Sequence, residues 1–351
     1  MNISAVAKRA GVSTATVSRV MNGTANVSPD TAEKVREAVE ALNFYPDVNA
    51  RALGSGRSGL YGLIISDITN PYFPELVKAF EDIAVEHGQD VLVANTDYDP
   101  KRMEMCVIRM LQRKVDGVAI MTSEMDERLI RTFSQRQIPT VFMDTLSAGA
   151  STVSVDYAAG ITDAMQHLFS LGHEEIAFIS GPLTLNSARV RADAFQRALR
   201  DHGATVRQEW LQEGDHRAEG GHHAMQRILR SGHKPTAVLG SNDLTAIGAM
   251  GAIHEAGLQI PRDISVVGFD DIELSGYTSP ALTTLRVPRR ELAMIAFRGL
   301  YRGRDEPVEK KARKKDHVVL PKLVMRESTG PVRKGLPVSG TKLAEPATAR
   351  G

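Results

Sequence analysis

Cysteine is almost absent from this sequence, since Cys106 is the only one among 351 residues. A single thiol excludes a disulfide-based scaffold and a zinc site built from cysteines. Long apolar runs are also missing, because no stretch reaches the roughly 18 apolar residues that cross a bilayer. The N-terminal segment MNISAVAKRAGVS has no apolar core of the kind found in signal peptides. We therefore expect a soluble, cytoplasmic protein that makes no use of a membrane.

A surplus of charge of either sign is missing as well. Lysine and arginine number 43 and aspartate and glutamate 42, which gives a formal net charge of +1. This balance excludes a protein that coats nucleic acid by overall charge, although a local basic surface can exist within a balanced total. Apolar residues make up 42% of the chain, which is enough for sizeable cores. At about 150 residues per domain, the length predicts two or three domains.

The central part of the chain has the pattern of an α/β protein. From residue 60 to about residue 329, short β-type runs alternate with amphipathic helical runs, which predicts parallel sheets with helices on both faces. The length suits two such sheets. The strand candidates are residues 60–66, 91–94, 117–121, 140–143, 152–155, 176–180, 237–240, 265–268 and 317–320.

The N-terminal residues, up to about residue 42, predict three short helices with tight turns. Apolar residues recur at helical spacing in residues 3–10, Gly11 supplies a turn conformation that glycine adopts readily, and Ser13 suits the N-cap of a second helix. A third helix would begin with Ser28 as its cap and Pro29 at its first position. This is the pattern of a helix-turn-helix DNA-binding motif, and the alternative is a generic small helical bundle.

The second of these helices carries the candidate DNA contacts. If it enters the major groove, Thr14 and Ala15 in its first turn face the base edges and suit a thymine methyl group. Arg19 lies one turn later on the same face and is equally suited to the O6 and N7 atoms of guanine or to a phosphate. The other candidate phosphate donors are Ser18, Asn22 and Ser28.

These features together resemble the lactose/purine repressor (LacI/GalR) family of bacterial transcriptional regulators. Similar segments occur in the family's order: AKRAGVSTATVSRVMNG, ISDITNPYFPELV, GHEEIAFISGP, PTAVLGSNDLTAIGAM, GLQIPRDISVVGFDDIELS and SPALTTLRVP. The resemblance implies a helix-turn-helix headpiece and a periplasmic-binding-protein-like core of two doubly wound parallel-sheet subdomains. It also implies a homodimer that binds a pseudo-palindromic double-stranded DNA operator.

The resemblance implies these domain boundaries. The headpiece comprises residues 1–43, the hinge helix and linker 44–59, the effector-binding and dimerisation core 60–329, and a disordered tail 330–351. Within the core, subdomain one comprises about 60–157 and 287–316, and subdomain two about 158–286 and 317–329.

The family's hinge helix aligns with residues 47–53. Leu53 would be the residue that paired hinge helices insert into the minor groove, where an apolar wedge unstacks a base step and bends the duplex. The alternative for Leu53 is a core contact within the linker. Because Gly54 follows directly, we expect the hinge helix to be marginally stable without DNA.

Several predicted strands are followed by polar or aromatic side chains. Ligands of open α/β sheets bind at the carboxyl ends of the strands, so these side chains are candidates for a ligand site. Tyr72 and Phe73 suit the wall of a sugar or base site, or they pack in the core. The polar candidates are Ser66, Asp67, Asn70, Asp144, Arg189, Arg191, Asn242, Asp270 and Asp271.

The family resemblance selects among these candidates. The matching cleft and effector positions are Phe73, Asp144, Arg191, Asn242 and Asp270. His216 stands where many members carry an aromatic residue that stacks on the ligand, which implies a more polar effector, whereas a surface-loop histidine is the alternative. Carboxylate, amide and guanidinium groups together suit a polyol, so we expect a sugar or sugar derivative, although a purine also fits arginine and aromatic groups.

We therefore expect a transcriptional repressor whose operator affinity is controlled allosterically by this effector. A purine-type or phosphoprotein corepressor in place of a sugar inducer is the alternative. A solute-binding protein would share the core but not the headpiece. An enzyme would need a nucleophile with a base, a metal site or a cofactor motif, and we expect none of these. The segment GSGRSG at 54–59 matches a dinucleotide pattern, but it follows a helical run and precedes a strand, the reverse of the required order.

Overall fold

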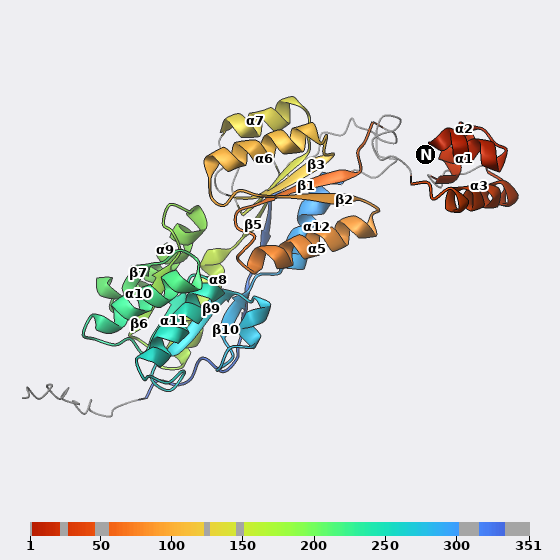
Figure 1. The fold of residues 1–351 in the computed structure, drawn as a ribbon. Coiled ribbons are helices and arrows are strands. Elements are labelled where there is room, and N and C mark those ends of the chain that lie inside the picture. Colours follow the sequence, from red (N-terminus) through yellow and green to blue (C-terminus); the bar gives the residue numbers. More distant parts are fainter. Residues whose placement is uncertain are drawn as a thin grey trace, which may run out of the picture. The chain divides into compact units, whose positions relative to one another are not determined.

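The computed structural model describes residues 2–21, 27–45, 56–122, 127–144, 151–301 and 316–333 (Figure 1). The chain divides into two compact units, of which the first comprises residues 1–60 with 114–116 and the second comprises the remainder. Each unit is described by itself.

The N-terminal unit contains the helices α1 (Ile3–Ala10), α2 (Thr14–Met21) and α3 (Pro29–Ala41). Helix α1 ends at Gly11, which adopts a left-handed φ of 66° and donates its N–H to the Ala7 carbonyl. Ser13 accepts the Thr16 N–H at 3.1 Å and so caps α2, as the sequence predicts. The helices enclose a small apolar core of Val6, Ala7, Val17, Val35, Ala38 and Phe44.

The first sheet of the second unit has the strand order β11-β5-β4-β3-β1-β2. Its strands are β1 (Leu60–Ile65), β2 (Asp90–Asn95), β3 (Gly117–Met121), β4 (Thr140–Met143), β5 (Ser151–Val155) and β11 (Asp316–Val319). Its helices are α5 (Tyr72–Glu86), α6 (Pro100–Gln112), α7 (Glu127–Gln135) and α12 (Arg289–Leu300). Figure 1 shows α6 and α7 on one face of this sheet and α5 and α12 on the other.

The second sheet has the order β12-β10-β9-β8-β6-β7. Its strands are β6 (Ile176–Ser180), β7 (Leu211–Glu213), β8 (Ala237–Gly240), β9 (Ser265–Asp270), β10 (Thr283–Arg286) and β12 (Lys322–Val324). The associated helices are α8 (Tyr157–Ser170), α9 (Asn186–Asp201), α10 (Ala218–Arg230), α11 (Asp243–Glu255) and the 3₁₀ turns η1 (Gln208–Trp210) and η2 (Glu273–Gly276). Strand β12 is antiparallel to β10, whereas β6, β7, β8, β9 and β10 pair in parallel.

The predicted fold class is confirmed, because both sheets are built from alternating strands and helices. The sequence pattern missed β7, β10 and β12, which have only 3, 4 and 3 residues. Strands this short carry too few alternating positions for a pattern to stand out.

The boundary near residue 316 is wrong in the sequence prediction. The pairs Asp316↔Thr152 to Val319↔Val155 place β11 in the first sheet. The Thr152 hydroxyl also donates to the Asp316 carboxylate at 2.6 Å. The chain therefore enters the second subdomain only after Val319, because the ladder to β5 continues to that residue.

The predicted start of the tail at residue 330 is also wrong. The Gly330 N–H donates to the Ser265 hydroxyl at 3.1 Å, and the Gly330 carbonyl lies 2.9 Å from Nε2 of His173. The Val332 N–H donates to the Leu171 carbonyl at 2.9 Å. These backbone bonds hold residues 330–333 on the second subdomain, and the rest of the predicted tail lies outside the described residues.

Candidate functional site

The outer face of α2 presents the residues that were predicted to contact DNA bases. Ala15 and Arg19 are exposed, whereas Val17 on the opposite side of the helix is fully buried. Thr14 is exposed as the first residue of the helix, and Ser18 is half-buried. The positions of Ala15 and Arg19 follow from the helical period, because residues two before and two after a buried Val17 lie about half a turn away, toward solvent.

Two of the predicted DNA-contacting residues, Asn22 and Leu53, lie outside the described residues, as does the predicted hinge helix. Ser28 has a second task, because its hydroxyl accepts the Thr31 N–H at 3.4 Å and caps α3. The Ser28 hydroxyl oxygen also lies 2.8 Å from Thr31 Oγ1, with either hydroxyl as the donor, so a phosphate contact by Ser28 requires its proton to point away from Thr31.

The second unit contains a cavity of about 220 Å³. It lies where the carboxyl ends of the strands of both sheets meet, the position expected for a ligand of doubly wound sheets. The structure brings together all of the residues that were predicted to bind the effector, since the cavity wall includes Tyr72, Phe73, Asp144, Arg191, His216, Asn242 and Asp270.

Arg191 is the central cation of the cavity. Its side chain is only 6% exposed, and its guanidinium carbon lies 4.2 Å from the ring centre of Tyr157 and 4.9 Å from that of Phe269. One Nη atom donates to the Ser241 carbonyl. The Nε atom is buried and has no hydrogen-bond partner in the described residues. Aromatic faces thus hold the guanidinium in position.

Two carboxyl groups face this cation. Burial raises the pKa of Asp144 to about 6, although the hydrogen bond from Tyr157 and the charge of Arg191 oppose the shift. The Tyr157 hydroxyl donates to Asp144 Oδ2 at 2.6 Å. Burial raises the pKa of Asp270 to about 7, against the lowering effect of Arg191 and Arg289. Perturbed carboxyl groups gathered in a concave site are typical of functional sites.

His216 and Asn242 form the adjoining wall. Burial, together with the charge of Arg191, lowers the pKa of His216 to about 3, so its imidazole is neutral at physiological pH. Its Nε2 lies 3.2 Å from the Ser241 hydroxyl. Asn242 donates to the His216 carbonyl at 3.0 Å and accepts the Thr245 N–H at 2.9 Å as the N-cap of α11. His216 is 8% exposed, which excludes the alternative of a surface-loop histidine.

Backbone conformation at the cavity is unusual. Asp144, His216 and Asp270 have positive φ angles of 65°, 63° and 116°. Non-glycine residues rarely adopt such angles, and they cluster at ligand sites where the surrounding structure holds them.

Tyr72 and Phe73 begin α5 and meet edge to face, with ring centres 5.4 Å apart. Both are buried in the apolar core and both also reach the cavity wall, so the core and ligand-wall alternatives describe the same two side chains. The Tyr72 hydroxyl is buried without a hydrogen-bond partner among the described residues. Like Arg191, Tyr72 is therefore a residue of the cavity wall whose buried polar atom lacks a partner among the described residues.

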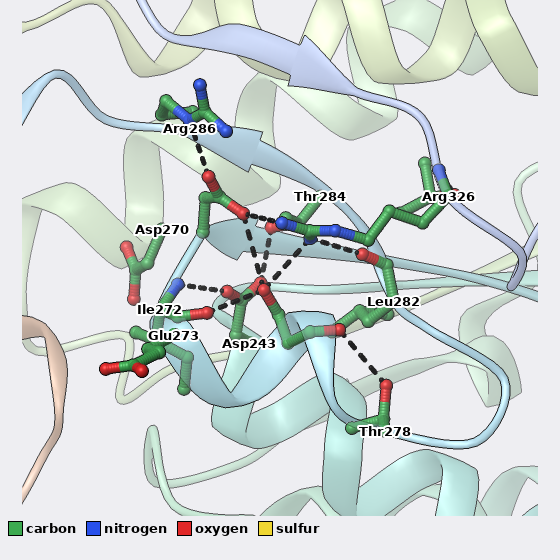
Figure 2. A network of polar contacts seen from close by, with 12 residues as sticks. Asp243, Asp270, Ile272, Glu273, Thr278, Leu282, Thr284, Arg286 and Arg326 are labelled. Atoms are coloured by element: carbon green, nitrogen blue, oxygen red, sulfur yellow. Dashed lines mark hydrogen bonds and ion pairs between the residues drawn. The ribbon is translucent and has the colours of Figure 1, made fainter.

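The residue after Asp270, Asp271, belongs to a different cluster, which includes Arg286 and Arg326; Figure 2 shows these two arginines. The Asp271 carboxylate accepts from Arg286 Nε at 2.5 Å and from Arg326 Nη2 at 2.5 Å. Arg326 also donates to the Leu282 carbonyl at 2.7 Å. No dashed contact in Figure 2 joins Asp270 to this network.

Sequence reasoning missed part of the cavity wall. Tyr157, which bonds Asp144 and stacks on Arg191, follows strand β5, and Thr122 follows β3. The rule that selected the other candidates, a position just after a strand, would have found both. Four further wall residues come from the segment between β6 and α9 and from the first turn of α9, which also supplies Arg189 and Arg191; they are Thr184, Leu185, Asn186 and Ser187.

Within the described residues no cluster of three or more His, Cys, Asp or Glu side chains is arranged to hold a metal ion. None of the described helices is long and apolar enough to cross a membrane.

Comparison with known proteins identifies the family. Residues 2–47 match the model of the bacterial regulatory proteins of the lacI family, and residues 165–329 match the periplasmic binding protein-like domain. The HTH-type transcriptional repressor PurR of Glaesserella parasuis serovar 5 is 37% identical over 294 residues, which cover 83% of this chain and 86% of that protein. The chain belongs to the lacI family.

Solved structures extend this result to the whole fold. The Lac repressor dimer bound to operator and the anti-inducer ONPF aligns with a TM-score of 0.83 and 31% identity, covering 94% of this chain and 99% of that one. The complex of the transcriptional regulator CelR with cellobiose aligns with a TM-score of 0.68 and 25% identity over 93% of this chain and 99% of that one. As a lacI-family member, this chain is a DNA-binding transcriptional regulator of the repressor type.

Proposed function

We propose that this lacI-family regulator binds a pseudo-palindromic operator as a homodimer in the cytoplasm and catalyses no reaction. A small neutral effector, a sugar or sugar derivative, sets its affinity for the operator. The observation that carries the effector class is the chemistry of the cavity wall, where Asp144 and Asp270 face the single buried guanidinium of Arg191. Ligand hydroxyls can donate to the carboxylates and accept from the guanidinium. The two buried carboxyl groups disfavour an anionic ligand to the extent that they are ionised, and the charges of Arg189 at the cavity wall and of Arg289 near Asp270 act against them. The neutral His216 adds no charge to this balance.

A purine corepressor is the second candidate. Tyr72, Phe73 and Tyr157 reach the wall and would suit a planar ring as well as a pyranose face. A relative at 37% identity carries the name PurR. The two candidates differ in the hydrogen-bond donors that they offer to the cavity, because a sugar, unlike a purine, presents vicinal hydroxyls to both carboxyl groups.

Thermal unfolding of the full-length chain distinguishes the candidates. The panel contains neutral mono- and disaccharides, the corresponding sugar phosphates, and purine bases. A ligand at about 100 times its Kd stabilises the folded state by roughly 2.7 kcal/mol, a readily measured rise in Tm. We expect a rise with a neutral sugar and none with its phosphate. A rise with purines alone supports the second candidate, and no rise with any compound supports a protein corepressor.

The DNA-binding role is assigned to residues of the headpiece and hinge. In this proposal Thr14, Ala15 and Arg19 contact base edges, and Leu53 is the minor-groove wedge. The phosphate-contacting residues in the proposal are Ser18, Asn22 and Ser28. The exposure of Ala15 and Arg19 on one face of α2, and of Thr14 at its N-terminal end, supports this assignment.

Operator binding by variants tests the assignment, with an operator selected from random double-stranded DNA. Arg19→Ala should cost about 1–3 kcal/mol of specific affinity and relax one base position in each half-site. Arg36→Ala removes the same charge from α3, where Arg36 pairs with Glu33, and should leave that base preference intact. Leu53→Ala should reduce the bend of bound DNA without changing dimer assembly. An unchanged bend angle would remove the wedge assignment.

The control mechanism is thermodynamic linkage. The effector prefers one relative orientation of the two subdomains, and that orientation sets the spacing of the two headpieces in the dimer. A coupling free energy of about 1–3 kcal/mol changes operator affinity roughly 5- to 150-fold. Inducer and corepressor differ only in which orientation the effector prefers.

A further inference from the structure

Arg217 crosses from the second subdomain to the first at the edge of the cavity. Its Nη2 atom lies 3.3 Å from Asp67 Oδ2 and 4.0 Å from Asp97 Oδ1. Asp67 follows β1 and Asp97 follows β2, both in the first sheet, whereas Arg217 is the residue before α10 of the second sheet. The ion pair therefore joins segments that belong to different subdomains.

Arg217 also follows His216 directly, and the short segment that contains both is held by the second subdomain. The Arg217 N–H donates to the Asp215 carboxylate at 2.9 Å, and Asn242 donates to the His216 carbonyl at 3.0 Å. The imidazole rests on Gly181, where an added Cβ would overlap the ring. A displacement of the Arg217 guanidinium would therefore move the adjoining His216, which lines the cavity.

The Asp67 end is equally well defined. Asp67 is 4% exposed, and its Oδ1 accepts the Thr69 N–H at 2.9 Å and the Thr69 hydroxyl at 2.6 Å. Oδ2 is the oxygen that faces Arg217. Burial alone would raise the pKa of Asp67, but the hydrogen bonds from Thr69 and the charge of Arg217 outweigh it and lower the pKa. Asp67 is therefore ionised at neutral pH and oriented before Arg217 reaches it.

We infer that Arg217 is a positioning residue for the effector response: its ion pair with Asp67 and Asp97 holds the His216 segment against the first subdomain and favours the arrangement of the two subdomains described here. The meaning of this pair for regulation rests on the effector role proposed for the cavity. The arginine side chain is 57% exposed, so the pair is screened by solvent and salt. Its loss should shift the population of this arrangement by at most about fivefold.

The test measures subdomain spacing and needs no effector, so its failure is distinguishable from a failure of the proposed function. Gln112 on α6 and His223 on α10 are exposed and lie in different subdomains. The substitutions Gln112→Cys and His223→Cys, in a Cys106→Ser background, allow two spin labels to be attached to the full-length chain. Double electron–electron resonance then gives the distribution of distances between the two spin labels. The labelled chain is diluted into unlabelled chain so that only distances within one chain contribute.

Arg217→Gln and Asp67→Asn should each move part of the distribution to longer distances. The double variant should show no larger shift than either single variant, because both remove the same interaction. Arg217→Lys should restore much of the parent distribution, 1 M salt should move the parent toward the variants, and Arg230→Gln on the same helix should match the parent. Variant distributions that coincide with the parent's, or single shifts that add in the double variant, would overturn the inference.

Discussion

Asp270 and Asp271 are neighbours in the chain and are 8% and 7% exposed, yet their carboxyl groups have opposite surroundings. Asp271 accepts hydrogen bonds from two arginine side chains, and these contacts lower its pKa even though burial alone would raise it. Asp270 faces the cavity, and burial raises its pKa to about 7. Adjacent carboxyl groups whose pKa values are pushed apart have different tasks. From this difference we propose that Asp271 stabilises the second subdomain, whereas Asp270 contacts the ligand.

The backbone makes this difference possible. Both residues have positive φ angles, 116° at Asp270 and 55° at Asp271, so successive side chains leave the end of β9 in directions that a regular strand would not give. Arg289 fixes the turn by donating to the Asp270 carbonyl at 2.6 Å and to the Asp271 carbonyl at 2.8 Å. Because Arg289 also pairs with Glu75 on α5 at 2.7 Å, the turn is connected to the first subdomain.

The largest expected effect is on folding. Asp271→Asn should lower the free energy of unfolding by about 2–3 kcal/mol, because it leaves two arginines without their carboxylate. This is below the roughly 3–5 kcal/mol for a fully buried pair, since Arg286 is 55% and Arg326 21% exposed. Asparagine tolerates a positive φ, so backbone strain should not contribute. Urea unfolding measures the loss. A variant as stable as the parent would mean that the network in Figure 2 is not structural.

The next effect is on effector binding and concerns Arg191, the cation that faces both carboxyl groups of the cavity. Arg191→Ala should weaken binding of the effector by about 1.5–3 kcal/mol through the loss of charge-assisted hydrogen bonds. Operator binding without effector should survive, because Arg191 belongs to the unit that does not contain the headpiece. Calorimetry with the sugar found by the thermal screen gives the affinity. An unchanged Kd would show that Arg191 only fills the space between Tyr157 and Phe269.

Asp270→Asn is the matched partner of Asp271→Asn, with the same chemical change one residue earlier. Its free energy of unfolding at neutral pH should not fall below that of the parent, because it removes a buried carboxyl group that is not paired in the Asp271 network and whose charged form is disfavoured by burial. Its effector affinity should fall by about 1.5–3 kcal/mol, as for a hydrogen bond to a charged group. Urea unfolding and calorimetry on the same preparation give both values. If Asp270→Asn lowered stability as much as Asp271→Asn, the comparison would fail.

The last effect is on the pH dependence of stability. The folded-state pKa of Asp270 is raised, so its contribution is present in full below the unfolded pKa of about 3.8 and is lost as pH rises toward about 7. The lowered pKa of Asp271 has the opposite sign, with a contribution lost only as pH falls below its unfolded value. Asp270→Asn should therefore become more stable relative to the parent between pH 5 and pH 8. If the urea midpoints of Asp270→Asn and of the parent changed in parallel across this pH range, the raised pKa could not belong to Asp270.

Much of the fold and of the cavity could be predicted because they depend on local sequence. Strand ends fix where Asp144 and Asp270 emerge, and the period of α2 fixes the face that carries Arg19. The boundary near residue 316 could not be predicted, because the ladder from Asp316 to Val319 depends on a partner strand about 160 residues earlier in the chain. The surroundings of Arg191 come from α8, α9 and β9 together, and no single segment encodes them. For the same reason, the Arg217–Asp67 pair has no signal in either segment alone.

The central claim is that ligand contacts in the cavity control operator affinity. The most direct test is operator binding by fluorescence anisotropy as the sugar from the thermal screen is added to the parent and to Asp270→Asn. The account predicts equal affinities without sugar, a change of roughly 5- to 150-fold for the parent on saturation, and little or no change for the variant at the same concentration. A parent and a variant that respond identically to the sugar would contradict it.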